Sequence, residues 1–178
     1  MVQFGSDTVL DDSMRLVVFD CFDTLVCMRQ RRYIARNGVR RLLNHLAKQR
    51  RELAILSDGS ERGVRSALQQ AGLGNRFPEI FAVERACELG ADGIMRKRLD
   101  RVMAHFRRSP AETVFIGDSP IDAEAARSQG AHFIRVPGEA DTDFSFAQLL
   151  DGASHYHSEC YVDRLLRSYR QDRVDEDA

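Results

Sequence analysis

The sequence lacks the features that would place it in a membrane, in a secretory compartment or on a polyanion. No apolar run in its 178 residues is long enough to cross a bilayer, and the N-terminal segment has no basic start followed by an apolar core. The formal net charge is −1, which gives no general affinity for polyanions. The four cysteines form no CxxC pair and no dense framework, as is typical of reduced thiols. We therefore expect a cytoplasmic protein that does not bind membranes.

Short apolar segments alternate with amphipathic segments of about ten residues along most of the chain. The apolar segments are rich in β-branched residues on both faces, which is typical of buried parallel strands. The amphipathic segments repeat their apolar residues with a helical period. This alternation predicts an α/β, three-layer Rossmann-like fold with a central, mostly parallel sheet. We expect strands at 15–20, 52–57, 79–83, 113–117 and 131–136, and helices at 38–49, 61–73, 97–108 and 119–130.

The length suits one compact core rather than two domains of ordinary size. Residues 1–14 are polar and aperiodic, and we expect a flexible lead-in there. Residues 15–150 are expected to form the core. Residues 151–178 are expected to be a C-terminal helical extension or tail.

Polar side chains follow the predicted strands at the points where the strands end. Since the carboxyl ends of parallel strands meet at one edge of a sheet, these side chains should converge. One aspartate in such a place is usually the N-cap of the next helix, but several strand-end groups in order are not explained by capping. Carboxylates without histidine or cysteine nearby favour Mg²⁺, and a hydroxyl beside a turn suits phosphate oxygens. The residues concerned are Asp20, Ser57, Asp58, Asp118 and Asp122.

Four motifs at these strand ends resemble the haloacid dehalogenase superfamily of phosphohydrolases. Members carry a strand-end D-x-D-x-T, then a strand-end Ser or Thr, a lysine, and a strand-end acidic pair. The resemblance runs from about residue 15 to 137, and its last motif, followed by "AEAARSQGA", is the most specific. The matching segments here are "DCFDT" (20–24), "AILSDGS" (54–60), "MRKRLD" (95–100) and "FIGDSPID" (115–122).

The resemblance implies a role for each metal-site residue. Asp20 would be the nucleophile that attacks phosphorus and forms an aspartyl-phosphate. Mg²⁺ would let this anionic nucleophile approach an anionic phosphate. The implied ligands are Asp20, the backbone carbonyl of Phe22, Asp118 and Asp122.

The resemblance also implies residues that contact the phosphoryl group and the substrate. Ser57 would hydrogen-bond the transferring group, and Lys97 would neutralise Asp20 and the phosphate. Of 26 basic residues only Lys48 and Lys97 are lysine, so a lysine here indicates a need for a compact ammonium group. The spacing from Lys97 to the acidic pair is short for the family, which leaves Arg96 as a substitute. The other residues expected around the substrate are Thr24, Asp58, Gly59 and Arg32.

The position two residues after the nucleophile departs from the family's pattern. Phosphatases of the family usually have an aspartate there, which protonates the leaving oxygen and later activates water. Phe22 can do neither, and Asp23, one residue on, would point the other way on a continuing strand. Because general acid–base help contributes ~10²–10⁴ in rate, alkyl phosphates should be hard to cleave, while substrates with good leaving groups should suffer less.

Three functions therefore remain open. The first is a Mg²⁺-dependent phosphohydrolase or phosphotransferase with an atypical acid. The second is a phosphate-binding or interaction module with little turnover. The third is a carbon–halogen hydrolase, since the dehalogenase branch also lacks the acid and needs no metal. Lys97, Asp118 and Asp122 together resemble the metal-dependent set and favour the first.

Neither position at which family members insert a cap domain has enough sequence for one. An open site suits a substrate that covers it: a phosphoprotein, a nucleic-acid end or a carrier-bound group. Alternatively, another subunit closes the site. The arginine-rich segment 27–41 either guides a phosphorylated substrate or is a solvated basic face, and one aromatic there, Tyr33, is weak support for nucleic acid.

A small cluster of His155, His157 and Cys160 lies near the C-terminus. A structural zinc site needs about four ligands, so we expect this cluster to be incidental. Residues 160–170 have a helical pattern that could pack on the domain or on a partner.

Overall fold

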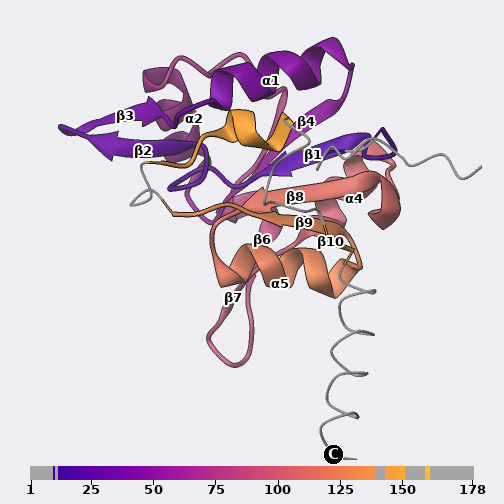
Figure 1. Cartoon of the computed structure of the whole chain (residues 1–178). Coiled ribbons are helices and arrows are strands. Elements are labelled where there is room, and N and C mark those ends of the chain that lie inside the picture. Colours follow the sequence, from indigo (N-terminus) through magenta and orange to yellow (C-terminus); the bar gives the residue numbers. More distant parts are fainter. Residues whose placement is uncertain (1–9, 11, 139–142, 151–158, 161–178) are drawn as a thin grey trace, which may run out of the picture.

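The computed structural model describes residues 10, 12–138, 143–150 and 159–160, and its centre is a six-stranded sheet in the order β10-β9-β8-β1-β4-β5 (Figure 1). Neighbouring strands pair in parallel except at the β9–β10 edge, which is antiparallel. The predicted fold class is therefore confirmed. The strands are β1 (Leu16–Phe19), β4 (Glu52–Leu56), β5 (Glu79–Phe81), β8 (Thr113–Gly117), β9 (His132–Arg135) and β10 (Glu159–Cys160).

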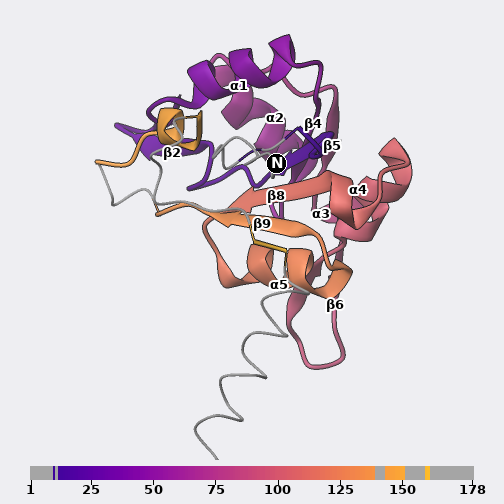
Figure 2. The same ribbon diagram turned by 45° about the vertical axis from the view of Figure 1, so that its right-hand side comes forward.

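Helices cover both faces of the sheet, which gives the predicted three layers (Figure 2). Alternate residues of β1 point to opposite faces of the sheet. Val17 and Phe19 pack with α1 (Val39–Lys48) and α2 (Glu61–Gln70) on one face. Leu16 and Val18 pack on the other side. That second layer contains α3 (Val83–Ala86), α4 (Leu99–Phe106) and α5 (Pro120–Gln129). Since both faces of β1 are buried, its sequence is apolar throughout.

Two short hairpins were not anticipated from the sequence. One pairs β2 (Val26–Arg29) with β3 (Arg32–Ala35), and the other pairs β6 (Cys87–Leu89) with β7 (Met95–Lys97). The prediction of a helix from residue 97 is wrong at its start, because Lys97 ends β7 and α4 begins at Leu99. Three- and four-residue strands are too short to show a reliable period of two.

No cap domain interrupts the sheet in the fully described stretch 12–138. Between β1 and β4 the chain forms only the β2–β3 hairpin and α1. Between β4 and β8 it forms α2, β5, α3, the β6–β7 hairpin, α4 and the 3₁₀ helix η1 (Pro110–Glu112). The edge at which the strands end is thus covered only by loops and hairpins.

The termini of the core contain further packing. Leu10 and Met14, within the segment expected to be a lead-in, are buried in the core. A predicted helical piece at 144–150 is the 3₁₀ helix η2 (Phe146–Leu150), which packs against α1. The predictions for His155, His157 and a helix at 160–170 concern residues outside those described, apart from Cys160 in β10. Among the described helices, none is long and apolar enough to cross a membrane.

Candidate active site

The carboxyl ends of β1 and β8 and the first turn of α5 bring three aspartates together. Phe19 is in register with Ile55 of β4 and Ile116 of β8, so Asp20 leaves the sheet between these two strands. The backbone N–H of Asp20 still donates to Ile116 at 2.9 Å, which fixes where the side chain starts. One carboxylate oxygen from each of Asp20, Asp118 and Asp122 lies within 4.8 Å of the others. The predicted convergence of these groups is present in the structure.

Lys97 joins this cluster from the end of β7. Its Nζ donates to Asp20 Oδ1 at 2.7 Å and to Asp122 Oδ1 at 2.6 Å, and all three side chains are buried. Burial by itself lowers the pKa of Lys97, but the carboxylates of Asp20 and Asp122 outweigh it and raise the pKa above its ordinary value. Lys97 is therefore a fixed cation. Arg96 instead pairs with Asp92 on the exposed side of the hairpin.

Burial has the opposite effect on the acid. Loss of hydration raises the pKa of Asp20 from its ordinary value of 3.8 to about 7, against the lowering effect of Lys97 and with a further increase from Asp122. A buried carboxylate at a raised pKa loses its proton when a second cation arrives, because the cation stabilises the charged form.

Thr24 links two of the carboxylates. Its hydroxyl donates to Asp118 Oδ1 at 2.5 Å and lies 3.3 Å from Asp20 Oδ2, and the residue is fully buried. A hydroxyl has one proton to donate, so Thr24 serves one carboxylate at a time. We had expected Thr24 around the substrate; the structure places it among the carboxylates.

The loop before α5 holds Asp122 in place. Ser119 and Asp122 form a capping box: the Ser119 N–H and hydroxyl both donate to Asp122 Oδ2, at 3.1 and 2.8 Å. This leaves Asp122 Oδ1 for Lys97. A Cβ on Gly117 would collide with the Asp122 carboxylate, so glycine is needed there. The S-x-x-D spacing was visible in the sequence, but the roles of Ser119 and Gly117 were missed.

Ser57 and the turn after it form the fourth side of the cluster. Ser57 is buried and its Oγ accepts the Gly59 N–H at 3.2 Å. Asp58 is half-exposed, with Oδ1 3.9 Å from the Lys97 ammonium. The predicted phosphoryl-binding turn therefore lies beside Lys97.

Comparisons with known proteins show the family of this chain. Residues 27–136 match the family described as haloacid dehalogenase-like hydrolase. The chain belongs to that family. A phosphoglycolate phosphatase of Pseudomonas putida is 32% identical over 102 residues, which cover 54% of this chain and 35% of the relative. The match thus spans about a third of that enzyme's length.

Solved structures of the family show the same fold. A haloacid dehalogenase superfamily hydrolase of Geobacter sulfurreducens aligns with a TM-score of 0.55 at 16% identity, covering 70% of this chain and 92% of its own. A haloacid dehalogenase-like protein of Streptococcus pneumoniae aligns with a TM-score of 0.57 at 13% identity, covering 73% and 90%.

The departure from the family's pattern at Phe22 has a clear structural setting. The Phe22 ring packs on Tyr33 of β3, with centroids 5.4 Å apart and planes at 54°. It also lies over Gly59, where an added Cβ would be 2.5 Å from Phe22 Cε2. Phe22 thus fills the space between the loop after Asp20 and the turn after Ser57. The role of its carbonyl as a metal ligand stays a prediction.

The backbone of Asp23 does not have the extended conformation of a strand. Its φ of 58° is left-handed, and the residue is exposed. Arg36 stabilises this turn, because its guanidinium donates to the carbonyls of Asp23 at 2.5 Å and Thr24 at 3.3 Å. The chain therefore does not continue as a strand after Asp20, and the alternation that we used to orient Asp23 does not apply.

The arginine-rich segment divides into two groups. Arg36 is buried, and Arg40 donates to the carbonyls of Ala71 and Gly72 after α2. These two are structural. The tip of the β2–β3 hairpin carries the exposed group: Arg29, Arg31 and Arg32. Among the described residues, none of the cluster's carboxylates pairs with Arg32.

The donor set at the strand ends fits Mg²⁺. Three carboxylates and one ammonium leave two negative charges in a buried cluster, which a divalent cation would match. All the donors are oxygens, as Mg²⁺ prefers. Asp20, Asp118 and Asp122 are the side chains that would hold it.

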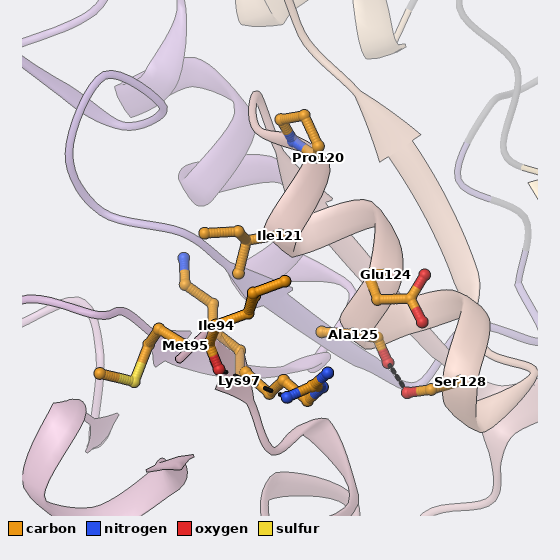
Figure 3. A pocket seen from close by; sticks show the side chains of 9 residues that line it. Ile94, Met95, Lys97, Pro120, Ile121, Glu124, Ala125 and Ser128 are labelled. Carbon is orange, nitrogen blue, oxygen red and sulfur yellow. Dashed lines mark hydrogen bonds between the residues drawn. The ribbon is translucent and has the colours of Figure 1, made fainter. Parts of the chain in front are cut away.

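A groove of about 510 Å³ lies between β7 and α5 (Figure 3). The stem of Lys97 lies near Ile94 and Ile121 at one end, with Glu124 and Ser128 at the other. Of the clustered residues only Lys97 lines the groove, so it is a neighbour of the carboxylate cluster and a separate surface.

Proposed function

We propose that this protein is a Mg²⁺-dependent phosphoric monoester hydrolase that works through an aspartyl-phosphate on Asp20. The observation that carries the proposal is the hydrogen bond of 2.7 Å between the Lys97 ammonium and Asp20, inside a cluster with Asp118 and Asp122. A buried carboxylate held in one orientation by a fixed cation is prepared for attack on phosphorus. The likeness to a phosphoglycolate phosphatase supports phosphatase chemistry.

Each residue has a task in this proposal. Asp20 attacks, Lys97 offsets the negative charge of Asp20 and the phosphoryl group, and Ser57 donates to a phosphoryl oxygen. Asp20, the Phe22 carbonyl, Asp118 and Asp122 would hold Mg²⁺, which would neutralise charge between the nucleophile and the phosphate. Thr24 and Ser119 orient the carboxylates that bind it.

The open edge favours a substrate that covers the site itself. No folded cap domain is inserted in the stretch 12–138, so water would be excluded when the substrate or another subunit closes the site. We propose a phosphorylated group on a macromolecule or carrier, in the cytoplasm.

Phosphate release tests the proposal. We would assay p-nitrophenyl phosphate and an alkyl phosphate with and without Mg²⁺, using Asp20→Asn as control. Cleavage of the aryl ester that depends on both Mg²⁺ and Asp20 is the expected result. Full activity in Asp20→Asn contradicts the nucleophile assignment. Asp23→Asn is the matched variant, since Asp23 is exposed and should tolerate the change.

Two other functions follow from specific observations. Phe22 in place of the acid favours a phosphate-binding module with little turnover. Phosphate binding without hydrolysis of any tested ester would support that function. A metal-independent carbon–halogen hydrolase is the third candidate. EDTA-insensitive release of halide from a haloacid would support that candidate.

A further inference from the structure

The side of the site where a leaving group departs is aromatic. Phe22 lies two residues after Asp20, and its ring sits over Gly59, two residues after Ser57. The ring therefore lies between the nucleophile's loop and the turn that would bind the phosphoryl oxygens. Phe22 and Tyr33 are both partly exposed. Both rings therefore offer accessible apolar surface beside the loop that follows Asp20.

Phe22 stands where the family has its acid, and its ring has no proton to donate. The buried ammonium of Lys97 donates to Asp20 and Asp122 at 2.7 and 2.6 Å. Asp23, one residue on, has a left-handed φ of 58° and is exposed. A leaving oxygen beside Phe22 would therefore depart as an anion unless the Tyr33 hydroxyl protonates it.

From this we infer, resting on the proposed function, that the substrate is an aryl phosphate whose ring packs on Phe22 and Tyr33. The pKa of a phenol is ~10, as for a tyrosine side chain. The pKa of an alkyl alcohol is close to that of water, ~15.7. Aromatic rings also prefer tilted packing against other rings. An aryl group thus fits the site in two ways. It leaves without help from an acid, and its ring packs on the apolar surface of Phe22 and Tyr33.

The chemistry balances without an acid in the first step. An Asp20 oxygen forms a bond to phosphorus as the bond from phosphorus to the aryl oxygen breaks, and that electron pair leaves with the phenolate. The phenolate takes its proton from solvent water. A water molecule then attacks the phosphorus of the aspartyl-phosphate, the bond to Asp20 breaks, and the carboxylate is regenerated as the water's proton passes to solvent.

Tyr33 is held firmly enough to act as a binding surface. Its backbone N–H donates to Gln70 Oε1 of α2 at 3.1 Å, which fixes β3 on that helix. At the tip of the same hairpin, Gln30 and Arg31 both have left-handed φ, of 48° and 63°. A turn with two left-handed residues favours Asn and Gly at these positions. Gln30 and Arg31 are therefore not the residues that the backbone geometry prefers. The turn is flanked by Arg29 and Arg32, and with Arg31 it presents three exposed guanidinium groups.

The three arginines at the tip of the β2–β3 hairpin can distinguish two kinds of aryl phosphate substrate. A free aryl phosphate and a phosphotyrosyl peptide share the chemistry that the rings recognise. Only a peptide with acidic residues around its phosphotyrosine would also reach the guanidinium groups of the tip. Peptide and free ester can therefore be distinguished by their response to changes at Arg31 and Arg32.

The test uses the full chain with Mg²⁺ and five substrates. These are an acidic phosphotyrosyl peptide, the same peptide with phosphoserine, phenyl phosphate, glycerol phosphate and acetyl phosphate. Acetyl phosphate has a good leaving group and no ring. We expect kcat/KM for phosphotyrosine to exceed that for phosphoserine by about 100-fold or more, the contribution of a missing general acid.

Variants of Tyr33 separate the ring from the leaving group. Tyr33→Ala should lower kcat/KM for phenyl phosphate relative to acetyl phosphate about three- to tenfold, the equivalent of one aromatic pair. Tyr33→Phe keeps the ring and should restore the ratio. Ile34→Ala, an exposed neighbour on the same strand, is the control and should leave the ratio unchanged.

The outcomes divide clearly. Equal cleavage of the two peptides overturns the inference, and so does a Tyr33→Phe variant that loses aryl cleavage, since the hydroxyl would then be the acid. Asp20-dependent cleavage of acetyl phosphate without a preference for aryl esters overturns the inference and leaves the proposed function standing. No turnover of any substrate overturns both. Aryl preference that is insensitive to Arg31→Ala with Arg32→Ala supports a small aryl phosphate, and sensitivity confined to the peptide supports phosphotyrosine.

Discussion

The ammonium of Lys97 lies 2.6 Å from Asp122 and 2.7 Å from Asp20, so one cation holds two carboxylates that are about a hundred residues apart in the chain. Lys97→Met should therefore destabilise the protein by about 3–5 kcal/mol, the cost of leaving buried charges without their partner. Thermal or urea unfolding would measure it. Lys48→Met changes the other lysine, which is exposed on α1, and should have little effect.

The loss in Lys97→Met should depend on pH. Burial already raises the pKa of Asp20 to about 7, and removing the ammonium raises that pKa further. The folded variant then binds more protons than the unfolded chain above pH ~4, so its stability falls as pH rises. We expect a larger difference from the parent protein at pH 8 than at pH 5. An equal difference at both would mean that Lys97 does not balance these carboxylates.

Mg²⁺ should stabilise the fold, and more so at higher pH. A proton on Asp20 competes with the metal, so apparent affinity should rise about tenfold per pH unit below the pKa of about 7 and level off above it. The increase in Tm with Mg²⁺ at pH 6 and pH 8 measures this. Asp118→Asn should abolish the increase, and EDTA should remove activity. Activity that survives EDTA would favour the carbon–halogen hydrolase.

Phe22→Asp should restore a general acid. Alkyl phosphates should then be cleaved faster, with ~10²–10⁴ as the ceiling, and aryl phosphates should gain less because their leaving group needs less help. Rates for one ester of each kind, in both proteins, give the comparison. If the two esters gain equally, the missing-acid argument is wrong. Phe22→Leu keeps the apolar character and is the control for the lost packing on Tyr33.

Gly117→Ala should displace the Asp122 side chain and so weaken the candidate metal site. The added methyl would collide with the Asp122 carboxylate, so that the carboxylate must move away from Lys97. We expect a loss of about 1–3 kcal/mol in stability, typical of overpacking, and weaker Mg²⁺ binding. At Gly138 an added Cβ meets nothing within 4 Å. Gly138→Ala should therefore behave like the parent protein, and an identical result at Gly117 would show that the collision is relieved cheaply.

The strand-end residues were predictable because parallel strands share one edge. Asp20, Asp118 and Asp122 converge for this reason, and the apolar pattern of β1 was enough to place the first of them. Lys97 was assigned from the resemblance to the family and supported by the rarity of lysine, although its strand was taken for a helix start. The geometry of the β6–β7 hairpin depends on cross-strand pairs, which a sequence of three-residue strands does not reveal.

Other features of the site depend on contacts between distant side chains. The packing of Phe22 on Tyr33 and Gly59 joins a loop, a hairpin and a turn, and no local pattern predicts it. The same holds for Arg36, which was grouped with surface arginines and is buried against the turn at Asp23. Arg40 and Arg41 are exposed like the tip arginines, so the expectation of an exposed basic segment fails at Arg36.

The position of β1 in the sheet also determines when the site can exist during synthesis. β1 is made first but pairs with β4 and β8, whose first residues, Glu52 and Thr113, lie 36 and 97 residues after Leu16 in the registers observed. A nascent chain therefore presents β1 without β4 for 36 residues of further synthesis and without β8 for 97. Asp122 follows β8, so the carboxylate cluster assembles only after this last neighbour of β1 has docked. Prolonged exposure of the apolar strand makes this chain a natural client for chaperones that bind extended apolar segments.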